Sequence, residues 1–536
     1  MVETNAMVQK LWFLLPEMAI FVGVVVVFIM GLSPSKRVRD LLPLMTSVFL
    51  GLGFALTPLV YDSEFGRRLL ENHDFLIMPM LGKYVKMVVC LMGIVLAMVS
   101  VGMIDRRMEA AVASGRIAFD PMRANRGEFF AFFMLSLIGV MLTCNANDLI
   151  WLFLSLELTS LPTYIMVAIS RPSRRAQEAG VKYFFLGAMA TAMFLYGFAL
   201  LYGAAGTMVL TDMRDAFQAQ AADGGINMLG IIGMILALLG IGFKIAAAPM
   251  HFYAADVYEG AASPVTAFLA FVPKTAGFIG IILLLSTMGW SGHNGPHGVE
   301  GLPQPILTTL WMIAVLTMTL GNVGAILQKS VKRVLAYSSI AHSGYMLIGV
   351  IAGPANNGIN AVLFYLLAYG IMNTAAFAVL AGLERRGQEI ESMDDLAGLR
   401  FKHPGMAVVM ALASGSLLGV PPLLGFWGKL YLFIAGVQAG HIPLVVIAGL
   451  NSAISAWYYL RLIALPIMSK PSAQAETIVP SPVKWPRIAG IVTAAAVVLL
   501  PAFVSPLFRA STTGALLTQA KTPDPAGPGV SELNLP

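Results

Sequence analysis

Residues 240–278 read GIGFKIAAAPMHFYAADVYEGAASPVTAFLAFVPKTAGF, and this stretch decides how the rest of the chain is interpreted. Both of its ends are apolar enough for a membrane interior, yet each end carries a lysine, Lys244 and Lys274. Pro249 interrupts the first apolar segment, because proline lacks the amide hydrogen that a helix needs. A charged side chain at the bilayer centre costs at least ~2.5–3.5 kcal/mol. The two lysines therefore predict a function inside the membrane, and proton transfer is the leading one.

The composition is that of a polytopic membrane protein. Of 536 residues, 58% are hydrophobic and 12% are charged, whereas soluble domains average about 25% charged residues. The net charge of +6 is small for this length and no basic run is interleaved with aromatic residues, so we expect no nucleic-acid partner. Cys90 and Cys144 lack the spacing of metal ligands, and no nucleotide-binding glycine motif is present. We expect no metal ion and no redox cofactor bound by this chain.

Fourteen apolar segments are long enough to cross a bilayer, which requires about 20 residues in a helix. The expected spans are 11–31, 41–60, 76–103, 129–146, 148–169, 181–205, 226–250, 262–287, 305–327, 334–352, 358–382, 405–436, 442–468 and 487–508. The first of them has no basic region before it, so we interpret it as a membrane helix and not as a cleavable signal. The expected fold class is an all-α polytopic membrane protein with about 14 transmembrane helices.

Lysine and arginine are distributed unevenly between the loops. Loops after odd-numbered spans carry most of them, for example Arg171, Arg174 and Arg175 after the fifth span, and loops after even-numbered spans carry few. Basic residues accumulate in cytoplasmic loops. We therefore expect the odd-numbered loops in the cytoplasm and both termini on the outer side.

Two spans are interrupted by proline, the seventh at Pro249 and the twelfth at Pro421 and Pro422. Paired interrupted spans are typical of transporters built from inverted repeats, in which irregular backbone lines a site inside the protein. Each unit has five helices, so the chain leaves it on the opposite side of the membrane from where it entered. The second unit must therefore be inverted relative to the first. The expected organisation is a three-helix segment at 1–128, five-helix repeats at 129–287 and 305–468, a last helix at 487–508 and a flexible tail at 509–536.

Three further charged residues lie within or beside the spans. Glu157 is in the middle of the fifth span, Lys182 is close to the start of the sixth, and Lys429 follows the break in the twelfth. Desolvation moves the pKa values of buried carboxyl and amino groups toward neutrality, which suits proton exchange. The alternatives are a static ion pair for Glu157 and snorkelling of Lys182 to the membrane surface.

Two histidines are candidates for proton relay, because histidine titrates near neutral pH. His251 follows the first break, and His342 lies in the tenth span within LAYSSIAHSGYM, next to Ser338 and Ser339. Alternatively, His251 satisfies backbone carbonyls freed by Pro249, and His342 is a packing residue.

The stretch FKIAAAPMHFYAADVYEGAASPVTAFLAFVPKTAGF resembles a motif of the antiporter-like membrane subunits of proton-pumping NADH:quinone oxidoreductase, respiratory complex I. Further matching segments are NDLIWLFLSLELTSLPTYIM, VKYFFLGAMATAMFLYGFALLYG, KSVKRVLAYSSIAHSGYMLIG and GVPPLLGFWGKLYLF. The resemblance covers spans five to twelve. One departure is Tyr253, which stands where the family usually has tryptophan, and we expect little effect from it.

The resemblance implies a role for each charged residue. Glu157 would pair with Lys244, Lys182 would modulate that pair, Lys274 would be the central proton carrier, and Lys429 would exchange protons with one side. The chain would be a non-redox subunit of the enzyme in a bacterial inner membrane. NADH and quinone would be used elsewhere in the complex, and the partners would be neighbouring membrane subunits and lipid.

Two alternatives remain open from the sequence. Subunits of multi-subunit sodium/proton antiporters share these motifs and would act without any NADH dehydrogenase. A membrane scaffold with static lysines would also account for the buried charges.

Overall fold

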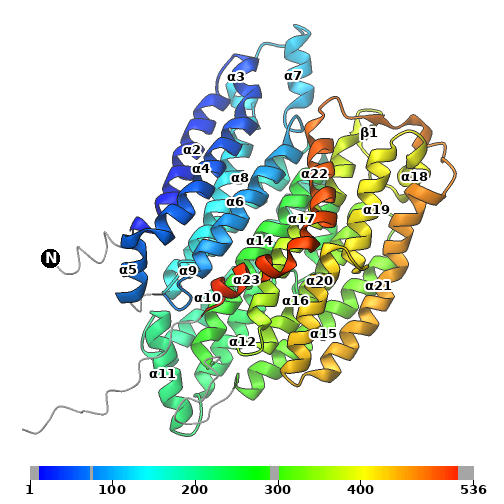
Figure 1. Cartoon of the computed structure of the whole chain (residues 1–536). Coiled ribbons are helices and arrows are strands. Elements are labelled where there is room, and N and C mark those ends of the chain that lie inside the picture. Colours follow the sequence, from blue (N-terminus) through cyan, green and yellow to red (C-terminus); the bar gives the residue numbers. More distant parts are fainter. Residues whose placement is uncertain (1–10, 73–75, 290–300, 517–536) are drawn as a thin grey trace, which may run out of the picture.

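The computed structural model describes residues 11–72, 76–289 and 301–516, and it consists mainly of long helices packed side by side (Figure 1). Among these residues, 11 helices are long and apolar enough to cross a membrane. They are α4 (Leu42–Asp62), α6 (Leu81–Ser100), α8 (Arg126–Thr143), α9 (Leu149–Ile169), α10 (Arg174–Ala205), α14 (Ser263–Leu285) with its extension η2 (Ser286–Met288), α15 (Gln304–Ile326), α16 (Val331–Ala352), α17 (Gly358–Gly382), α21 (Ile442–Met468), and α22 (Trp485–Leu499) joined by η5 (Leu500–Phe503) to α23 (Val504–Gly514).

Three shorter apolar helices complete the set of expected spans. They are α2 (Leu15–Gly31), α12 (Met228–Gly242) and α19 (Pro404–Leu418). The all-α polytopic fold predicted from the sequence is thereby confirmed. The expected tail does not begin at residue 509, because α23 continues to Gly514, and residues 517–536 lie outside the described residues.

The connections hold short elements. These are α3 (Lys36–Asp40), α5 (Glu64–Asn72), α7 (Arg106–Ala113), η1 (Pro121–Arg123), α11 (Leu210–Ala222), α13 (Tyr253–Gly260), α18 (Met393–Leu396), η3 (Leu399–Phe401), α20 (Leu424–Gln438) and η4 (Ala475–Thr477). A small antiparallel sheet has the strand order β2-β1-β3, with β1 at Leu383–Arg385, β2 at Gln388–Glu389 and β3 at Val479–Pro480. In Figure 1, α3, α7, β1 and α18, which follow odd-numbered spans, gather at the upper end, and α11, which follows the sixth, lies at the lower end.

The seventh span is divided into α12 and α13 by an irregular segment around Pro249. The freed backbone groups find partners there: the Tyr253 hydroxyl donates to the Phe243 carbonyl at 2.8 Å, and the Ala248 amide donates to the Thr317 hydroxyl at 2.9 Å. Backbone groups at membrane depth need such partners, since no water is available from lipid.

The twelfth span is divided in the same manner into α19 and α20. The Gly425 amide at the start of α20 donates to the Ser416 hydroxyl at 2.9 Å, and Lys429 donates to the Leu418 carbonyl at the end of α19 at 2.8 Å. The seventh span starts from the end that carries α11, and the twelfth starts from the end that carries α18 (Figure 1). This opposite sense is the relation expected of an inverted repeat.

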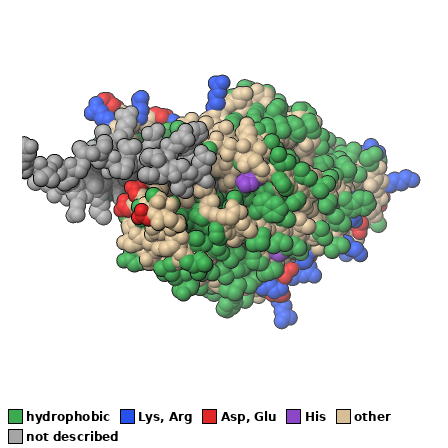
Figure 2. Space-filling model, turned by 90° about the horizontal axis from the view of Figure 1, so that it is seen from below, with side chains coloured by type: hydrophobic (Ala, Val, Ile, Leu, Met, Phe, Trp, Pro, Cys, Tyr) green, Lys and Arg blue, Asp and Glu red, His purple; other side chains and the backbone are tan. Residues whose placement is uncertain are grey.

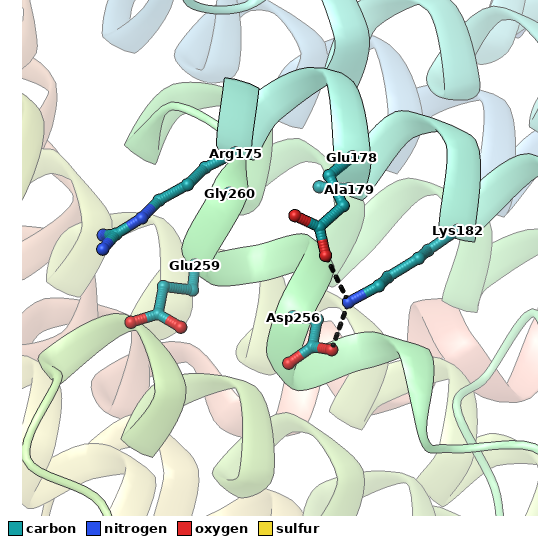
Figure 3. A pocket seen from close by; sticks show the side chains of 7 residues that line it. All are labelled: Arg175, Glu178, Ala179, Lys182, Asp256, Glu259 and Gly260. Carbon is teal, nitrogen blue, oxygen red and sulfur yellow. Dashed lines mark hydrogen bonds and ion pairs between the residues drawn. The ribbon is translucent and has the colours of Figure 1, made fainter. Parts of the chain in front are cut away.

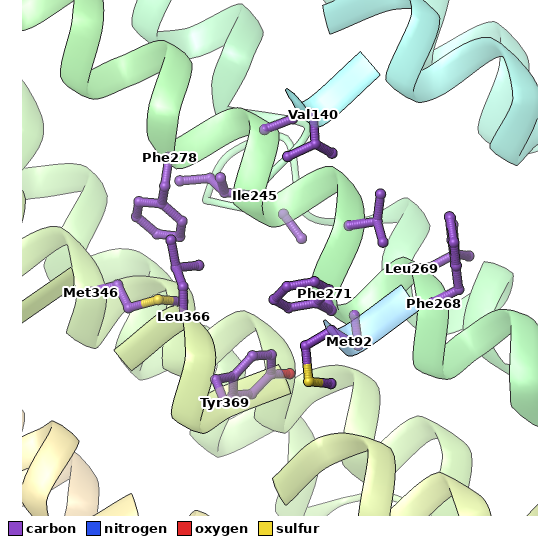
Figure 4. Packing of buried hydrophobic residues seen from close by; sticks show 14 of the residues in the cluster. Met92, Val140, Ile245, Phe268, Leu269, Phe271, Phe278, Met346, Leu366 and Tyr369 are labelled. Atoms are coloured by element: carbon purple, nitrogen blue, oxygen red, sulfur yellow. The ribbon is translucent and has the colours of Figure 1, made fainter. Parts of the chain in front are cut away.

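Two helices form the centre of the molecule, since every residue of α14 and of α17 is buried. Phe271 and Phe278 of α14 pack among apolar side chains of neighbouring helices, and Tyr369 of α17 lies close by (Figure 4). On the face seen in Figure 2, hydrophobic side chains predominate and charged side chains lie mainly toward the margins. A lysine on α14 is therefore enclosed by protein on all sides.

Candidate functional site

Glu157 and Lys244 form an ion pair between α9 and the segment that follows α12. Glu157 projects from α9, and Lys244 lies just past the end of α12, where the helix begins to break. The Lys244 Nζ is 3.1 Å from the Glu157 Oε1, and it also donates to the Ser160 hydroxyl at 2.6 Å and to the Leu156 carbonyl at 3.2 Å. The Thr191 hydroxyl donates to the same Glu157 oxygen at 2.9 Å. The carboxylate thus has a second donor besides Lys244.

Lys274 lies on the enclosed helix α14 and has no carboxylate partner among the described residues. Its ammonium donates to the Ser339 carbonyl and, at 2.7 Å, to the Ser343 hydroxyl, both on α16. The Ser343 hydroxyl in turn donates to the Ile245 carbonyl at 2.6 Å. One serine therefore joins Lys274 to the backbone next to Lys244.

His342 is the centre of a buried cluster of hydroxyl groups. Its Nδ1 lies 2.6 Å from the Tyr365 hydroxyl and its Nε2 lies 2.8 Å from the Tyr459 hydroxyl, which also contacts the Ser338 hydroxyl. A neutral imidazole has one donor and one acceptor nitrogen. One tyrosine therefore donates to the ring while the other accepts from it, which is the arrangement of a proton relay.

Lys429 lies on α20 beside the second break, and only 5% of the residue is exposed. Besides the Leu418 carbonyl, its ammonium contacts the Ser452 hydroxyl at 3.3 Å and lies 5.0 Å from the centre of the Tyr345 ring. The same ring is 5.8 Å from the His342 ring. The residues of α16 thus connect the surroundings of Lys274, His342 and Lys429.

Two candidate residues lie outside this series of contacts. Lys182 is at the exposed side of α10, where it pairs with Glu178 at 2.8 Å and with Asp256 at 3.2 Å. His251 is half-buried at the first break, its ring lies tilted against that of Phe252 with 4.9 Å between the ring centres, and its Nδ1 has no hydrogen-bond partner within the described residues. No hydrogen bond found in those residues links either side chain to Glu157, Lys244 or Lys274.

The sequence did not indicate several polar residues that complete the network. Ser160, Thr191, Ser343, Tyr365 and Tyr459 each contact one of the candidate groups. Serine, threonine and tyrosine are common in membrane helices, so the residue type alone gives no signal. A polar residue one helical turn from a charge within a span, as Ser160 is from Glu157 on α9, was the only available indication.

A second charged cluster closes one end of the same helices. Arg171, which follows α9, pairs with Glu389 and Glu391 at 2.5 Å each, and Lys332 at the start of α16 pairs with Glu391 at 3.1 Å. Ser263 at the start of α14 donates to Glu389 through its hydroxyl at 2.7 Å and its amide at 3.0 Å. Burial alone would raise the pKa of Glu389, but Lys332, Arg171 and the Ser263 donors outweigh it and lower the pKa to about 2.

Metal binding is not indicated by the described residues, which contain no group of three or more His, Cys, Asp or Glu side chains placed to hold an ion. The available chemistry is proton exchange between amines, an imidazole, hydroxyls and one carboxylate.

Comparison with known sequences is consistent with this chemistry. The family described as NADH:quinone oxidoreductase/Mrp antiporter, TM matches residues 146–455. A protein from Trichlorobacter lovleyi named NADH-quinone oxidoreductase subunit N is 44% identical over 342 residues, which cover 63% of this chain and 67% of the relative. A protein of the same name from Rhodospirillum rubrum is 44% identical over 347 residues, which cover 64% and 68%.

Comparison with solved structures gives the same fold. A chain of respiratory complex I from Thermus thermophilus with bound Aureothin is 28% identical, with a TM-score of 0.72 over 93% of this chain and 100% of that chain. A chain of the Mrp complex from Dietzia sp. DQ12-45-1b is 20% identical, with a TM-score of 0.73 over 95% and 97%. The second likeness concerns the fold alone.

Proposed function

The chain belongs to the NADH:quinone oxidoreductase/Mrp antiporter membrane family, and from this premise we propose how its buried residues move protons. It is a proton-translocating membrane subunit of a respiratory NADH:quinone oxidoreductase, and its partners are the other membrane subunits of that complex. It contributes no redox chemistry of its own. NADH oxidation and quinone reduction take place in other subunits, and their free energy reaches this chain through its neighbours.

The first step is the opening of the Glu157–Lys244 pair. Opposite charges about 4 Å apart interact by roughly 4 kcal/mol at an effective dielectric constant of 20. Breaking the pair therefore changes the field at nearby groups by an amount that can move a proton. The Thr191 hydroxyl retains Glu157 in place while Lys244 turns toward the break.

The second step is proton release from Lys274. When Lys244 turns toward the break, its positive charge approaches Ile245 and the Ser343 hydroxyl that binds Lys274. Repulsion between the two ammonium groups favours the neutral form of Lys274. The proton then passes along the polar groups near Ser339 and His342, and along bound water, to Lys429. Lys429 lies beside the break in the twelfth span. Lys182 is placed to influence this process only through its charge, by way of Asp256.

Lys244→Ala tests this proposal in the assembled complex. We expect NADH:quinone electron transfer to remain measurable while proton translocation by the reconstituted complex falls by at least about tenfold. Lys83→Ala is the matched control, because Lys83 is an accessible lysine paired with Asp62 at the outer surface. Full proton translocation by the assembled Lys244→Ala complex would overturn the mechanism.

The orientation is a further part of the proposal: odd-numbered loops face the cytoplasm of a bacterial inner membrane, and both termini face the periplasm. It is supported by the excess of lysine and arginine in the odd-numbered loops. Both native cysteines are buried, so a single introduced cysteine reports its own position. Arg116→Cys should react with an impermeant maleimide only from the cytoplasm, and Asp223→Cys only from outside; the reverse pattern would contradict the orientation.

A sodium/proton antiporter subunit is the alternative function. The Mrp chain with the same fold is only 20% identical, whereas the proteins at 44% identity bear the name of a NADH-quinone oxidoreductase subunit. The sequence relationships therefore favour the respiratory enzyme.

A further inference from the structure

A small polar cavity of about 220 Å³ opens on the side of the molecule between α10 and α13 (Figure 3). Its charged lining residues are Arg175, Glu178, Lys182, Asp256 and Glu259. Figure 3 shows the Lys182 ammonium between the Glu178 and Asp256 carboxylates, and the Arg175 guanidinium at the opposite side, near Glu259. None of these groups belongs to the buried lysine network.

The charges of the cavity are balanced. Arg333 reaches its edge from α16 and pairs with Asp256 at 3.0 Å and with Glu259 at 2.9 Å. With Arg175 and Lys182 it supplies three positive charges against three carboxylates. Only Arg175 has no ion pair or hydrogen bond among the described residues. The cavity therefore has no net charge, and it offers a ligand the unpaired guanidinium of Arg175 and the oxygen atoms of three carboxylates.

The cavity lies at the level of the lipid headgroups. The helix α10 has 32 residues, which span about 48 Å at 1.5 Å per residue, whereas the hydrocarbon core is about 30 Å thick. Residues 183–205 carry no charged side chain and are long enough to cross the hydrocarbon, so we place the first turns, which carry Arg175 and Lys182, at its edge. Three apolar residues beside Lys182 on the helix, Val181, Phe184 and Phe185, are 56%, 45% and 66% exposed. They provide an apolar surface next to the cavity.

We propose that this cavity binds the headgroup of a zwitterionic phospholipid whose amine carries N–H groups, such as phosphatidylethanolamine. The phosphate contacts Arg175, whose guanidinium can donate two parallel hydrogen bonds to it. The ammonium group donates to Glu259 and Glu178, and the acyl chains lie along Val181, Phe184 and Phe185. An anionic lipid such as phosphatidylglycerol gains less, because its headgroup has no ammonium group to donate to the carboxylates.

The same geometry favours a lipid over a segment of a neighbouring subunit. Every carboxylate in the cavity is already paired within this chain, so no acidic group requires a countercharge from a partner. A zwitterionic headgroup can replace ion pairs within the cavity by equivalent pairs with its own phosphate and ammonium groups. The exposed apolar residues beside the cavity suit the flexible acyl chains of a lipid.

Native mass spectrometry of the purified full chain with added palmitoyl-oleoyl lipids tests the proposal. Wild type should retain phosphatidylethanolamine at one site in preference to phosphatidylcholine, whose methylated ammonium has no N–H donor, and to phosphatidylglycerol. Arg175→Ala should reduce retention of both zwitterionic lipids by about tenfold, as expected for loss of a charged hydrogen bond. Glu259→Gln should remove the preference for the ethanolamine lipid while binding persists.

Arg174→Ala is the matched control, because Arg174 is exposed, adjacent in sequence and absent from the cavity lining. Unchanged retention in Arg175→Ala, an equal loss in Arg174→Ala, a preference for phosphatidylglycerol, or equally tight binding of soluble phosphoethanolamine would each overturn the proposal. In the assembled complex, a photoactivatable residue at position 181, which lies beside the cavity and leaves Arg175 in place, should crosslink to phosphatidylethanolamine. A crosslink to a neighbouring subunit instead would show that protein occupies the cavity.

Discussion

The three buried lysines of the network differ in their partners. Lys244 faces a carboxylate, whereas Lys274 and Lys429 contact only carbonyl and hydroxyl oxygens among the described residues. A carboxylate stabilises an ammonium more strongly than a neutral acceptor does. The ammonium form is therefore stabilised most strongly by its partners at Lys244 and less strongly at Lys274 and Lys429. This difference suits the proposed order of steps, in which Lys244 controls the transfer and Lys274 and Lys429 exchange the proton.

The hydrogen bonds around His342 allow us to predict the effect of changing one residue, Tyr459. Tyr459→Phe removes the partner of the His342 Nε2 and the contact to Ser338 without changing the size of the ring. We expect the proton translocation rate to fall by about 10²-fold, the lower value for a lost proton-transfer group, while the complex assembles normally. The measurement is acidification by reconstituted vesicles, normalised to NADH oxidation.

Trp457→Phe is the control for Tyr459→Phe, because Trp457 lies on the same helix but is 69% exposed. It should translocate protons as wild type does. Equal rates for Tyr459→Phe and wild type would exclude the tyrosine from the path.

A buried ion pair outside the network gives a second prediction. Lys86 of α6 lies 2.8 Å from Glu17 of α2, and neither side chain is accessible to more than 4%. Breaking such a pair leaves an uncompensated buried charge and typically costs about 3–5 kcal/mol, whereas an apolar replacement of both residues is often neutral or stabilising. Lys86→Met alone should therefore lower the unfolding temperature in detergent, and Glu17→Leu with Lys86→Met should restore it. A double variant as unstable as Lys86→Met would contradict the prediction.

At the scale of single elements, the break in the twelfth span depends on a close approach between α19 and α20. A Cβ atom added at Gly425 would lie 2.0 Å from the Ser416 carbonyl oxygen, so the two half-helices would have to separate. Overpacking of this kind costs about 1–3 kcal/mol. Gly425→Ala should lower stability by that amount and displace Lys429, which is seen as reduced proton translocation.

Gly449→Ala is the matched control on the neighbouring helix α21. A Cβ atom there meets nothing within 4 Å, and alanine favours a helix over glycine by up to ~1 kcal/mol. This variant should unfold at the same temperature as wild type or slightly higher. If both variants behaved alike, the contact at Gly425 would not matter.

The elements were predictable because membrane crossing requires long apolar runs and proline interrupts helices, so Pro249, Pro421 and Pro422 marked both breaks. The pairing of Glu157 with Lys244 was indicated only through the family resemblance. The sequence left open whether Lys182 is buried or reaches the surface, since this depends on which side of α10 faces outward and on α13 supplying Asp256. The periodicity of apolar residues along the sequence does not show which elements lie side by side, so contacts such as that of Ser343 with Ile245 cannot be predicted from it.

At the scale of the whole molecule, the cluster of Arg171, Lys332, Glu389 and Glu391 joins the end of α9 and the start of α14 to the start of α16. The pKa of Glu389 is lowered to about 2. Its charge therefore stabilises the fold fully above the pKa of an unfolded glutamate, about 4.3. This contribution, up to ~3 kcal/mol at 1.36 kcal/mol per pKa unit, is lost as the pH falls from there toward 2.

Glu389→Gln tests this dependence. Wild type should lose more stability than the variant between about pH 4.5 and 2, as measured by unfolding temperature in detergent. Glu128→Gln is the control, because Glu128 is exposed and forms no ion pair within the part of the chain that the structure describes. Parallel pH profiles for wild type and Glu389→Gln would contradict the proposed contribution.

The complete enclosure of α14 has a consequence for biosynthesis. The helix is surrounded in part by α16 and α17, which leave the ribosome after it. When α14 first enters the bilayer, its side chains must therefore face lipid or the insertion machinery, including the side that carries Lys274. Insertion of this lysine before its serine partners on α16 arrive is costly. The neutral form of Lys274, which the proposed proton transfer requires, is thus also the form in which the nascent helix can cross the membrane at least cost.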